Sequence, residues 1–166
     1  SYTFAIDGVS RALTHQLVRH RIASFNQQSQ RYVKFKGEVS VVKPESVAAN
    51  AEASAKFDEA IQAAVDAYHA LLEAGVPAED ARYLLPNAAE SKIVVTMNVR
   101  ELLHFFSLRC CNRAQWEIRD MSHRMLELAR PTAPFIFADA GAPCVRGACP
   151  EGKMTCGNPY PKVTRE

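Results

Sequence analysis

The chain has 166 residues, of which 48% are hydrophobic and 23% are charged, and its formal net charge at pH 7 is +2. These values are ordinary for a globular protein and argue against a general nucleic-acid binder, which is usually far more basic. The sequence shows no apolar run long enough to span a membrane and no signal peptide, so we expect no membrane partner. Its five cysteines are an odd number, and without a secretory signal they predict reduced thiols and a cytoplasmic location.

The first twenty residues predict a short strand and an amphipathic helix. Residues 2–6 carry β-favouring side chains, and because the chain opens in this strand without an initiator Met, we expect further sequence before it. Ser10 is a suitable N-cap for the helix. The apolar face of this helix is expected to hold Leu13, Leu17 and Val18. At i, i+3 and i+4 spacing, another face is expected to hold Gln16, Arg19 and His20.

The middle of the chain predicts two more short strands and two helices. Residues 31–42 alternate between apolar and polar side chains, which is typical of two short strands joined by a turn. Residues 46–74 are rich in alanine, carry apolar side chains at helical spacing and are followed by Gly75, so they predict a long helix. Residues 78–85 predict a short helix that is closed by Pro86.

The second half predicts a strand, two helices and a loop-rich tail. Residues 93–99 are rich in β-branched side chains and predict a strand that runs into a helix over residues 100–109. Residues 114–130 predict a further amphipathic helix. We therefore predict an α+β fold with a small antiparallel or mixed sheet, a long helix and a helical bundle. Residues 1–166 are expected to form one domain that ends in a Cys-, Pro- and Gly-rich tail over residues 141–166.

Residues 19–31 carry the clearest sign of a ligand site, because cationic, hydroxyl and amide side chains follow one another closely. Arg82, in an apolar run, and Asn98, at a strand-to-helix junction, are further candidates. Arginine binds phosphate or carboxylate in a bidentate manner and amides read base edges, so the pattern favours nucleotide ligands. Neither the G-x-G-x-x-G nor the Walker A pattern is present. The alternative is a nucleotide- or RNA-binding module that uses the same basic segment.

Covalent catalysis is less favoured than ligand binding. Candidate nucleophiles by residue type are Ser24, Ser29, Cys110 and Cys111. Cationic surroundings could activate either thiol, but a cysteine pair before a helix is as often simple packing. The tail spacing Cys144-x4-Cys149-x6-Cys156 lacks the paired C-x2-C spacing of zinc sites and has no nearby histidine. Reduced structural thiols or a facultative disulfide are therefore favoured over a metal site.

Residues 19–31 (RHRIASFNQQSQR) match the pattern RHRxxSxxxxSxR, and on these residues the chain resembles the flavin-dependent thymidylate synthases. The resemblance continues in the same order through residues 81–86 (ARYLLP), 96–102 (TMNVREL) and 108–118 (LRCCNRAQWEI). The first pattern is long and specific, and the four segments together span most of the chain. The tail lies outside them.

The resemblance implies an α+β fold and an intertwined homotetramer whose active sites form between subunits. It implies FAD as the cofactor, NADPH as the reductant and 5,10-methylenetetrahydrofolate as the carbon donor. The implied reaction is the reductive methylation of dUMP to dTMP, with no nucleic-acid partner and no metal. Members of the family also use an upstream segment with His and Thr to contact FAD, and nothing in this chain matches it.

The resemblance also implies roles for individual residues. Flavin would be bound by Arg19, His20, Arg21, Gln27, Asn98, Val99, Arg100 and His104. The substrate dUMP would be bound by Gln16, Leu17, Val18, Arg19, Gln27, Gln28, Ser29, Gln30, Arg31, Arg82 and Arg109. Arg82 would act from a neighbouring subunit, and Ser29 would be a binder, since the pattern offers it no base. Arg109 would be catalytic, because a guanidinium against the uracil favours its ionised N3 form and so raises the nucleophilicity of C5.

Overall fold

The computed structural model describes residues 1–32, 35 and 37–163, and the chain divides into two compact units. Unit 1 consists of Ser1–Phe4, Gln16–Phe25 and Val95–Glu166, and unit 2 consists of Ala5–His15 and Asn26–Val94. The small net charge of the chain conceals a difference between them. Unit 1 has 12 lysines and arginines against 7 aspartates and glutamates, whereas unit 2 has 8 against 11. Unit 1 is therefore cationic and unit 2 is anionic.

Three strands, each divided between the two units, form one antiparallel sheet in the order β1-β3-β2. They are β1 (Tyr2–Ser10), β2 (Ala23–Gln27) and β3 (Glu90–Met97). The Thr3 and Thr96 hydroxyls lie 2.9 Å apart, and Lys92 Nζ lies 2.9 Å from Asp7 Oδ2. Residue numbers therefore rise along β1 as they fall along β3, which is an antiparallel register. Strands β1 and β3 were both predicted, but β1 runs further, to Ser10, whereas β3 begins earlier, at Glu90, and ends earlier, at Met97. The mixed helix-and-sheet fold class is confirmed.

The two strands predicted over residues 31–42 are wrong. Apart from residues 33, 34 and 36, which lie outside the described residues, this segment contains only an isolated bridge between Val41 and Ala89. The extended pairing lies earlier, in β2, whose burial alternates along the strand. The strand was missed because most side chains of β2 are polar, so its alternation of exposed and partly buried residues is not visible as an alternation of polar and apolar residues.

Helix α1 (Arg11–Leu17) begins as predicted, because Ser10 Oγ accepts a hydrogen bond from the Leu13 amide at 3.0 Å. The helix is shorter than expected. The amides of Arg19 and His20 bond to the carbonyls three residues earlier, which tightens the chain into a turn. Gln16, Arg19 and His20 therefore do not share a helical face: Arg19 is exposed, and His20 is only 5% exposed.

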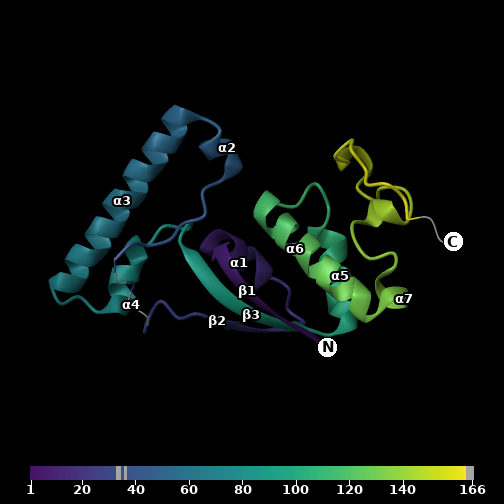
Figure 1. Ribbon diagram of the computed structural model, residues 1–166, viewed down its shortest axis with the longest axis horizontal. Helices are drawn as coiled ribbons and strands as arrows, with labels where there is room; N and C mark the ends of the chain where they lie inside the picture. Colours follow the sequence, from purple (N-terminus) through teal and green to yellow (C-terminus); the bar gives the residue numbers. More distant parts are fainter. Residues whose placement is uncertain (33–34, 36, 164–166) are drawn as a thin grey trace. The chain divides into compact units, whose positions relative to one another are not determined.

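The helices of unit 2 follow the prediction with one break. The predicted long helix consists of α2 (Glu45–Ala48) and α3 (Ala51–Glu73), and Asn50 caps the second by accepting from the Ala53 amide. At the end of α3, Gly75 has a φ of 86°. The amides of Gly75 and Val76 bond to Leu72 and Leu71 respectively, which is a Schellman motif. The short α4 (Ala78–Ala81) then leads into a 3-10 turn, Arg82–Leu84, beside α3 (Figure 1).

Unit 1 contains a pair of helices, α5 (Val99–Arg109) and α6 (Trp116–Ala129), that lie side by side (Figure 1). Their facing sides are buried through Leu102, Phe105, Phe106, Ile118, Met121 and Met125. After α6 come η2 (Arg130–Thr132), α7 (Pro134–Phe137), η3 (Pro143–Val145) and η4 (Gly152–Met154). Among the described residues, no helix is both long and apolar enough to cross a membrane.

Candidate functional site

His20 is the centre of a buried polar chain in unit 1. Its Nδ1 lies 3.1 Å from Glu101 Oε1, and its Nε2 lies 3.0 Å from Arg109 Nε. The imidazole ring also packs edge-on against Phe105, with 5.0 Å between ring centroids. His20 and Glu101 are only 5% and 6% exposed. A buried imidazole therefore links the Glu101 carboxylate to the Arg109 guanidinium.

The partners of His20 determine which of its nitrogens carries the proton. An arginine Nε can only donate, so Nε2 of His20 must accept, and Nδ1–H then donates to Glu101. A second proton would break the hydrogen bond from Arg109. Burial, assisted by the charge of Arg109, lowers the pKa of His20, while the hydrogen bond to Glu101 opposes this shift. Neutral His20 therefore anchors Arg109 Nε, and the terminal nitrogens of the guanidinium can bind another group.

The start of α5 supplies both Glu101 and further candidate groups. Asn98 is the N-cap, and its Oδ1 accepts from the Glu101 amide at 2.9 Å. Helix geometry leaves the N–H groups of the first turn, including that of Val99, without intrahelical acceptors, which favours an anion there. The NH2 group of the Asn98 side chain can donate to a ligand without disturbing this cap.

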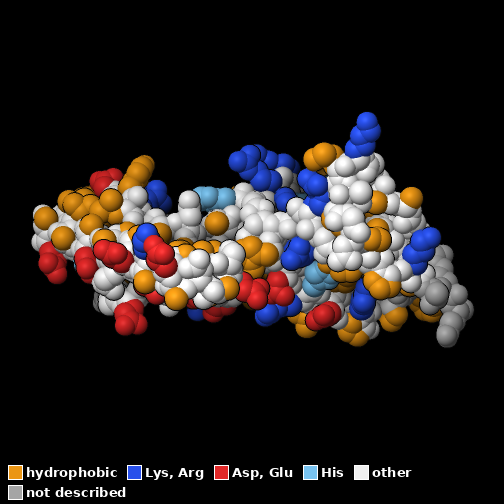
Figure 2. Space-filling model, turned by 90° about the horizontal axis from the view of Figure 1, so that it is seen from above, with side chains coloured by type: hydrophobic (Ala, Val, Ile, Leu, Met, Phe, Trp, Pro, Cys, Tyr) orange, Lys and Arg blue, Asp and Glu red, His pale blue; other side chains and the backbone are white. Residues whose placement is uncertain are grey.

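Arginines surround this end of unit 1 without counter-charges. Arg19, Arg21 and Arg100 are exposed, and none of them makes a side-chain hydrogen bond or ion pair within the part of the chain that the structure describes. His104, one turn after Arg100, is also exposed, and its ring centroid lies 6.3 Å from that of His20. Lys and Arg side chains stand out on the visible surface of unit 1, with few acidic side chains among them (Figure 2). This surface suits an anionic ligand.

A second cationic group lies within unit 2 and converges on Glu79. Arg31 Nε and NH2 lie 2.9 and 2.7 Å from Glu79 Oε2, and Arg82 Nε donates to the Glu79 carbonyl at 3.0 Å. Burial, together with repulsion from Arg82, lowers the pKa of the nearby Arg11. Arg31 and Glu79 are each about half exposed, so a dianionic ligand could displace this weakly held carboxylate from Arg31.

The remaining residues of the predicted nucleotide segment differ in what they can offer. Gln27 donates both hydrogens of its amide, to Thr14 Oγ1 and Ser91 Oγ, so it holds β2 in place and can offer a ligand only Oε1. The amide of Gln28 bonds to the Lys92 carbonyl. Ser29 Oγ accepts from the Arg31 amide at 3.2 Å and shapes a turn. The buried Gln30 Nε2 has no partner among the described residues, which suits a donor that awaits a ligand.

The predicted ligand residues before Arg19 have less access to a ligand than the arginines do. Leu17 is fully buried, so its side chain is part of the core, and its carbonyl accepts from the His20 amide. Gln16 and Val18 are half-buried at the end of α1. Among these residues, Gln16 keeps a polar side chain near the surface.

Cys110 does not have the properties of an activated nucleophile. It is fully buried, and its sulfur accepts a hydrogen bond from Ser122 Oγ at 3.3 Å. Burial raises the pKa of the Cys110 thiol, which argues against an activated nucleophile and agrees with simple packing for this residue. Every cysteine of the chain is free of disulfide bonds.

Sequence reasoning missed Glu101, Glu79 and Arg11. The Asn98-x-x-Glu101 spacing is that of a capping box, and a carboxylate placed among arginines could have marked Glu101 as a partner. Glu79 stands three residues before Arg82 and is brought to Arg31 only by the fold. No local sequence pattern predicts the contact between Glu79 and Arg31.

Comparison with known proteins identifies the family of the chain. Residues 1–135 match the family model described as thymidylate synthase complementing protein. Curated relatives named flavin-dependent thymidylate synthase include that of Geobacter sulfurreducens, which is 62% identical over 158 residues, covering 95% of this chain and 68% of the relative. Those of Nitratidesulfovibrio vulgaris and Clostridium tetani are 58% and 49% identical, and this chain covers 69% of each.

Proposed function

The chain belongs to the flavin-dependent thymidylate synthase family, and from that premise we propose that it catalyses the reductive methylation of dUMP to dTMP. The observation that carries this proposal is the match to the family over residues 1–135, which includes every arginine of the two cationic groups. The cofactor would be FAD, with NADPH as reductant and 5,10-methylenetetrahydrofolate as carbon donor.

The unpaired arginines of unit 1 fit the anionic part of FAD. Arg19, Arg21 and Arg100 are exposed and lack counter-charges within the described residues, and the N-terminus of α5 adds backbone N–H donors. His104, the side-chain NH2 of Asn98, the N–H of Val99 and Oε1 of Gln27 belong to the proposed set. His20 would meet the flavin only with its ring edge, because both of its nitrogens are engaged by Glu101 and Arg109. When bound, the flavin supplies hydride transfer. The protein residues bind and orient it.

The cationic group of unit 2 would hold the phosphate of dUMP. Arg31 and Arg82 are the proposed phosphate ligands, with the phosphate replacing Glu79 at the Arg31 guanidinium. Gln30 Nε2, which is buried and without a partner in the described part of the chain, would donate to the nucleotide. Ser29 and Gln28 would position the same turn.

Arg109 would supply the electrostatic part of catalysis. Its Nε is committed to His20, so its terminal N–H groups would face the uracil and stabilise negative charge as N3 ionises. That charge makes C5 a better nucleophile for the incoming one-carbon unit. His20 and Glu101 act on the substrate only by holding the guanidinium in position, and are positioning residues.

We further propose that the enzyme is a homotetramer and that each active site combines residues of different subunits. In that arrangement, Arg82 of one chain would complete the dUMP site whose Arg109 belongs to another.

Anaerobic flavin reduction tests the proposed reaction. The purified protein is expected to be yellow, to be bleached by NADPH without oxygen, and to regain colour with dTMP formation only when dUMP and methylenetetrahydrofolate are both added. A colourless protein that does not take up FAD, and instead binds RNA with a steep salt dependence, would contradict the proposal and favour a nucleic-acid-binding module.

A further inference from the structure

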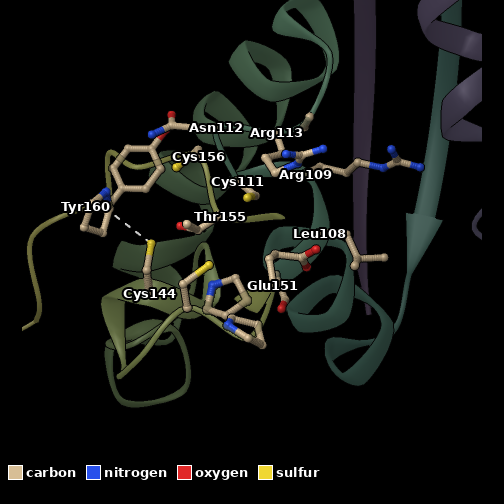
Figure 3. A pocket seen from close by; sticks show the side chains of 16 residues that line it. Leu108, Arg109, Cys111, Asn112, Arg113, Cys144, Glu151, Thr155, Cys156 and Tyr160 are labelled. Atoms are coloured by element: carbon tan, nitrogen blue, oxygen red, sulfur yellow. Dashed lines mark hydrogen bonds between the residues drawn. The ribbon is translucent and has the colours of Figure 1, made fainter. Parts of the chain in front are cut away.

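The Cys-rich tail and the loop after Arg109 enclose a cavity of about 390 Å³ in unit 1. Cysteines of the chain line this cavity from both sides: Cys111 from the loop, and Cys144, Cys149 and Cys156 from the tail. Figure 3 shows the sulfur atoms of Cys111, Cys144 and Cys156 around one space. The tail itself contains three cysteines. The fold brings a fourth, Cys111, to the same cavity from a distant part of the sequence.

Backbone and side-chain groups around the cavity suit thiolates. The Tyr160 amide donates to Cys144 Sγ and the Asn158 amide donates to Cys156 Sγ, both at 3.4 Å. Arg113 also lines the cavity and supplies positive charge. N–H donors and nearby cations stabilise sulfur ligands that carry negative charge.

The tail is held to the rest of unit 1 mainly by polar contacts, among them those of Tyr160 with Asn112 at 2.7 Å and His123 at 3.2 Å. Up to residue 163, where the described part of the tail ends, its only regular elements are the single turns η3 and η4, and none of residues 146–163 is buried. Asn112 Nδ2 and Arg113 NH1 bond to the carbonyls of Asn158 and Met154. Segments with so little core usually depend on disulfides or a metal centre, and the cysteines here form no disulfide.

From these observations we propose that Cys111, Cys144, Cys149 and Cys156 hold an iron–sulfur cluster of the [4Fe–4S] class. A single zinc ion needs all its sulfurs about 2.3 Å from one point. Among the described residues, no three His, Cys, Asp or Glu side chains are close enough to share one ion. A cubane cluster gives each cysteine its own iron, so its ligands stand around a larger volume, as they do in this cavity.

The cluster has a structural role: it fixes the tail against residues 111–113, directly after Arg109. Binding replaces thiol protons, including the one that Cys156 shares with the Asn158 carbonyl at 3.3 Å. The proposal does not depend on the proposed function, because iron and sulfide can be measured without any turnover.

The experiment is isolation of the full chain under anaerobic conditions, followed by analysis of iron, acid-labile sulfide and zinc per chain. We expect about four irons and four sulfides and a Mössbauer spectrum of a [4Fe–4S] cluster, which distinguishes it from the flavin absorbance. Zinc without sulfide, or a metal-free protein with or without a disulfide between these cysteines, would overturn the proposal.

Two single variants with a matched control localise the cluster. Cys149→Ser and Cys156→Ser are expected to lose most of the iron and sulfide. Cys110→Ser, next to Cys111 but absent from the cavity lining, is expected to keep both. Equal iron and sulfide in all three variants would place the cluster elsewhere and contradict the assignment. If a tail variant does not fold, the metal content of the native chain and of Cys110→Ser still decides the case.

Discussion

At the scale of one residue, the orientation of Arg109 depends on the protonation state of a single imidazole, that of His20. His20 accepts the hydrogen bond from Arg109 Nε only while its Nε2 is unprotonated, whereas Nδ1–H donates to Glu101 in either state. Its burial therefore does more than fill the core, because it selects the protonation state that orients Arg109. A surface histidine would titrate near neutral pH and release this arginine.

The lowered pKa of His20 predicts a loss of stability in acid. Because the unfolded chain binds a proton near pH 6.5 and the folded chain binds it only at lower pH, the free energy of unfolding falls as pH drops below about 6.5. The slope from this group approaches about 1.4 kcal/mol per pH unit and vanishes above that range. Denaturant unfolding at a series of pH values measures it.

The matched variants for this test are His20→Gln and His15→Gln. The first removes the titrating group and should flatten the slope, although it lowers stability overall, whereas His15 is exposed and its replacement should leave the slope unchanged. If both variants keep the native slope, the acid sensitivity has another source.

Arg109→Ala should lower the rate of dTMP formation by about 100-fold or more, because an electrostatic contact made in the transition state is lost. Flavin content should stay near native, since Arg100 and Arg19 are intact. Arg124→Ala is the control, because this arginine forms an exposed pair with Asp120 and should have little effect. Near-native turnover in Arg109→Ala would refute the catalytic role.

At the scale of an element, the N-terminus of α5 combines a cap with a proposed flavin contact. Asn98→Ala should cost about 1 kcal/mol of stability by removing the cap, and should also weaken FAD binding. Asn98→Asp keeps an acceptor for the Glu101 amide but lacks the NH2 group, so it should retain stability and still bind FAD more weakly. Denaturant unfolding and FAD titration separate the two roles, and full FAD affinity in Asn98→Asp would contradict the flavin contact.

The end of α3 depends on a backbone conformation that glycine adopts without strain. Gly75 has a φ of 86°, and a Cβ there would meet no atom within 4 Å, so Gly75→Ala should cost about 1 kcal/mol through the backbone alone. Gly147→Ala is the control, since its φ lies outside that region and its surroundings are also open. Equal unfolding free energies for the two variants would argue against the Schellman motif as a stabilising feature.

Elements with strong local signals were predictable, and elements defined by distant contacts were not. The helices over α3, α5 and α6 follow from periodicity and end signals such as Gly75, and β3 follows from its β-branched side chains. The early end of α1 was not predictable, because it depends on turning His20 towards Glu101, 81 residues later. Pattern matching found the arginines of the candidate site, whereas Glu79 becomes a partner of Arg31 only through the fold.

At the scale of the whole molecule, the proposed ligand residues are divided between the two units. Arg109 and the unpaired arginines belong to cationic unit 1, whereas Arg31 and Arg82 belong to anionic unit 2. The proposed site shared between subunits would combine arginines of unit 1 from one chain with arginines of unit 2 from another. If the site is shared in this way, two inactive variants should complement each other within one tetramer.

Mixed tetramers of Arg82→Ala and Arg109→Ala should regain activity that neither variant has alone. If Arg82 and Arg109 of one site come from different chains, random mixing leaves about a quarter of the sites with both arginines native. If they come from the same chain, every site lacks one of them. Co-expression of the two variants with different tags, tandem purification and measurement of dTMP formation decide between these cases. A mixed tetramer as inactive as its parents would show that each chain builds its own site.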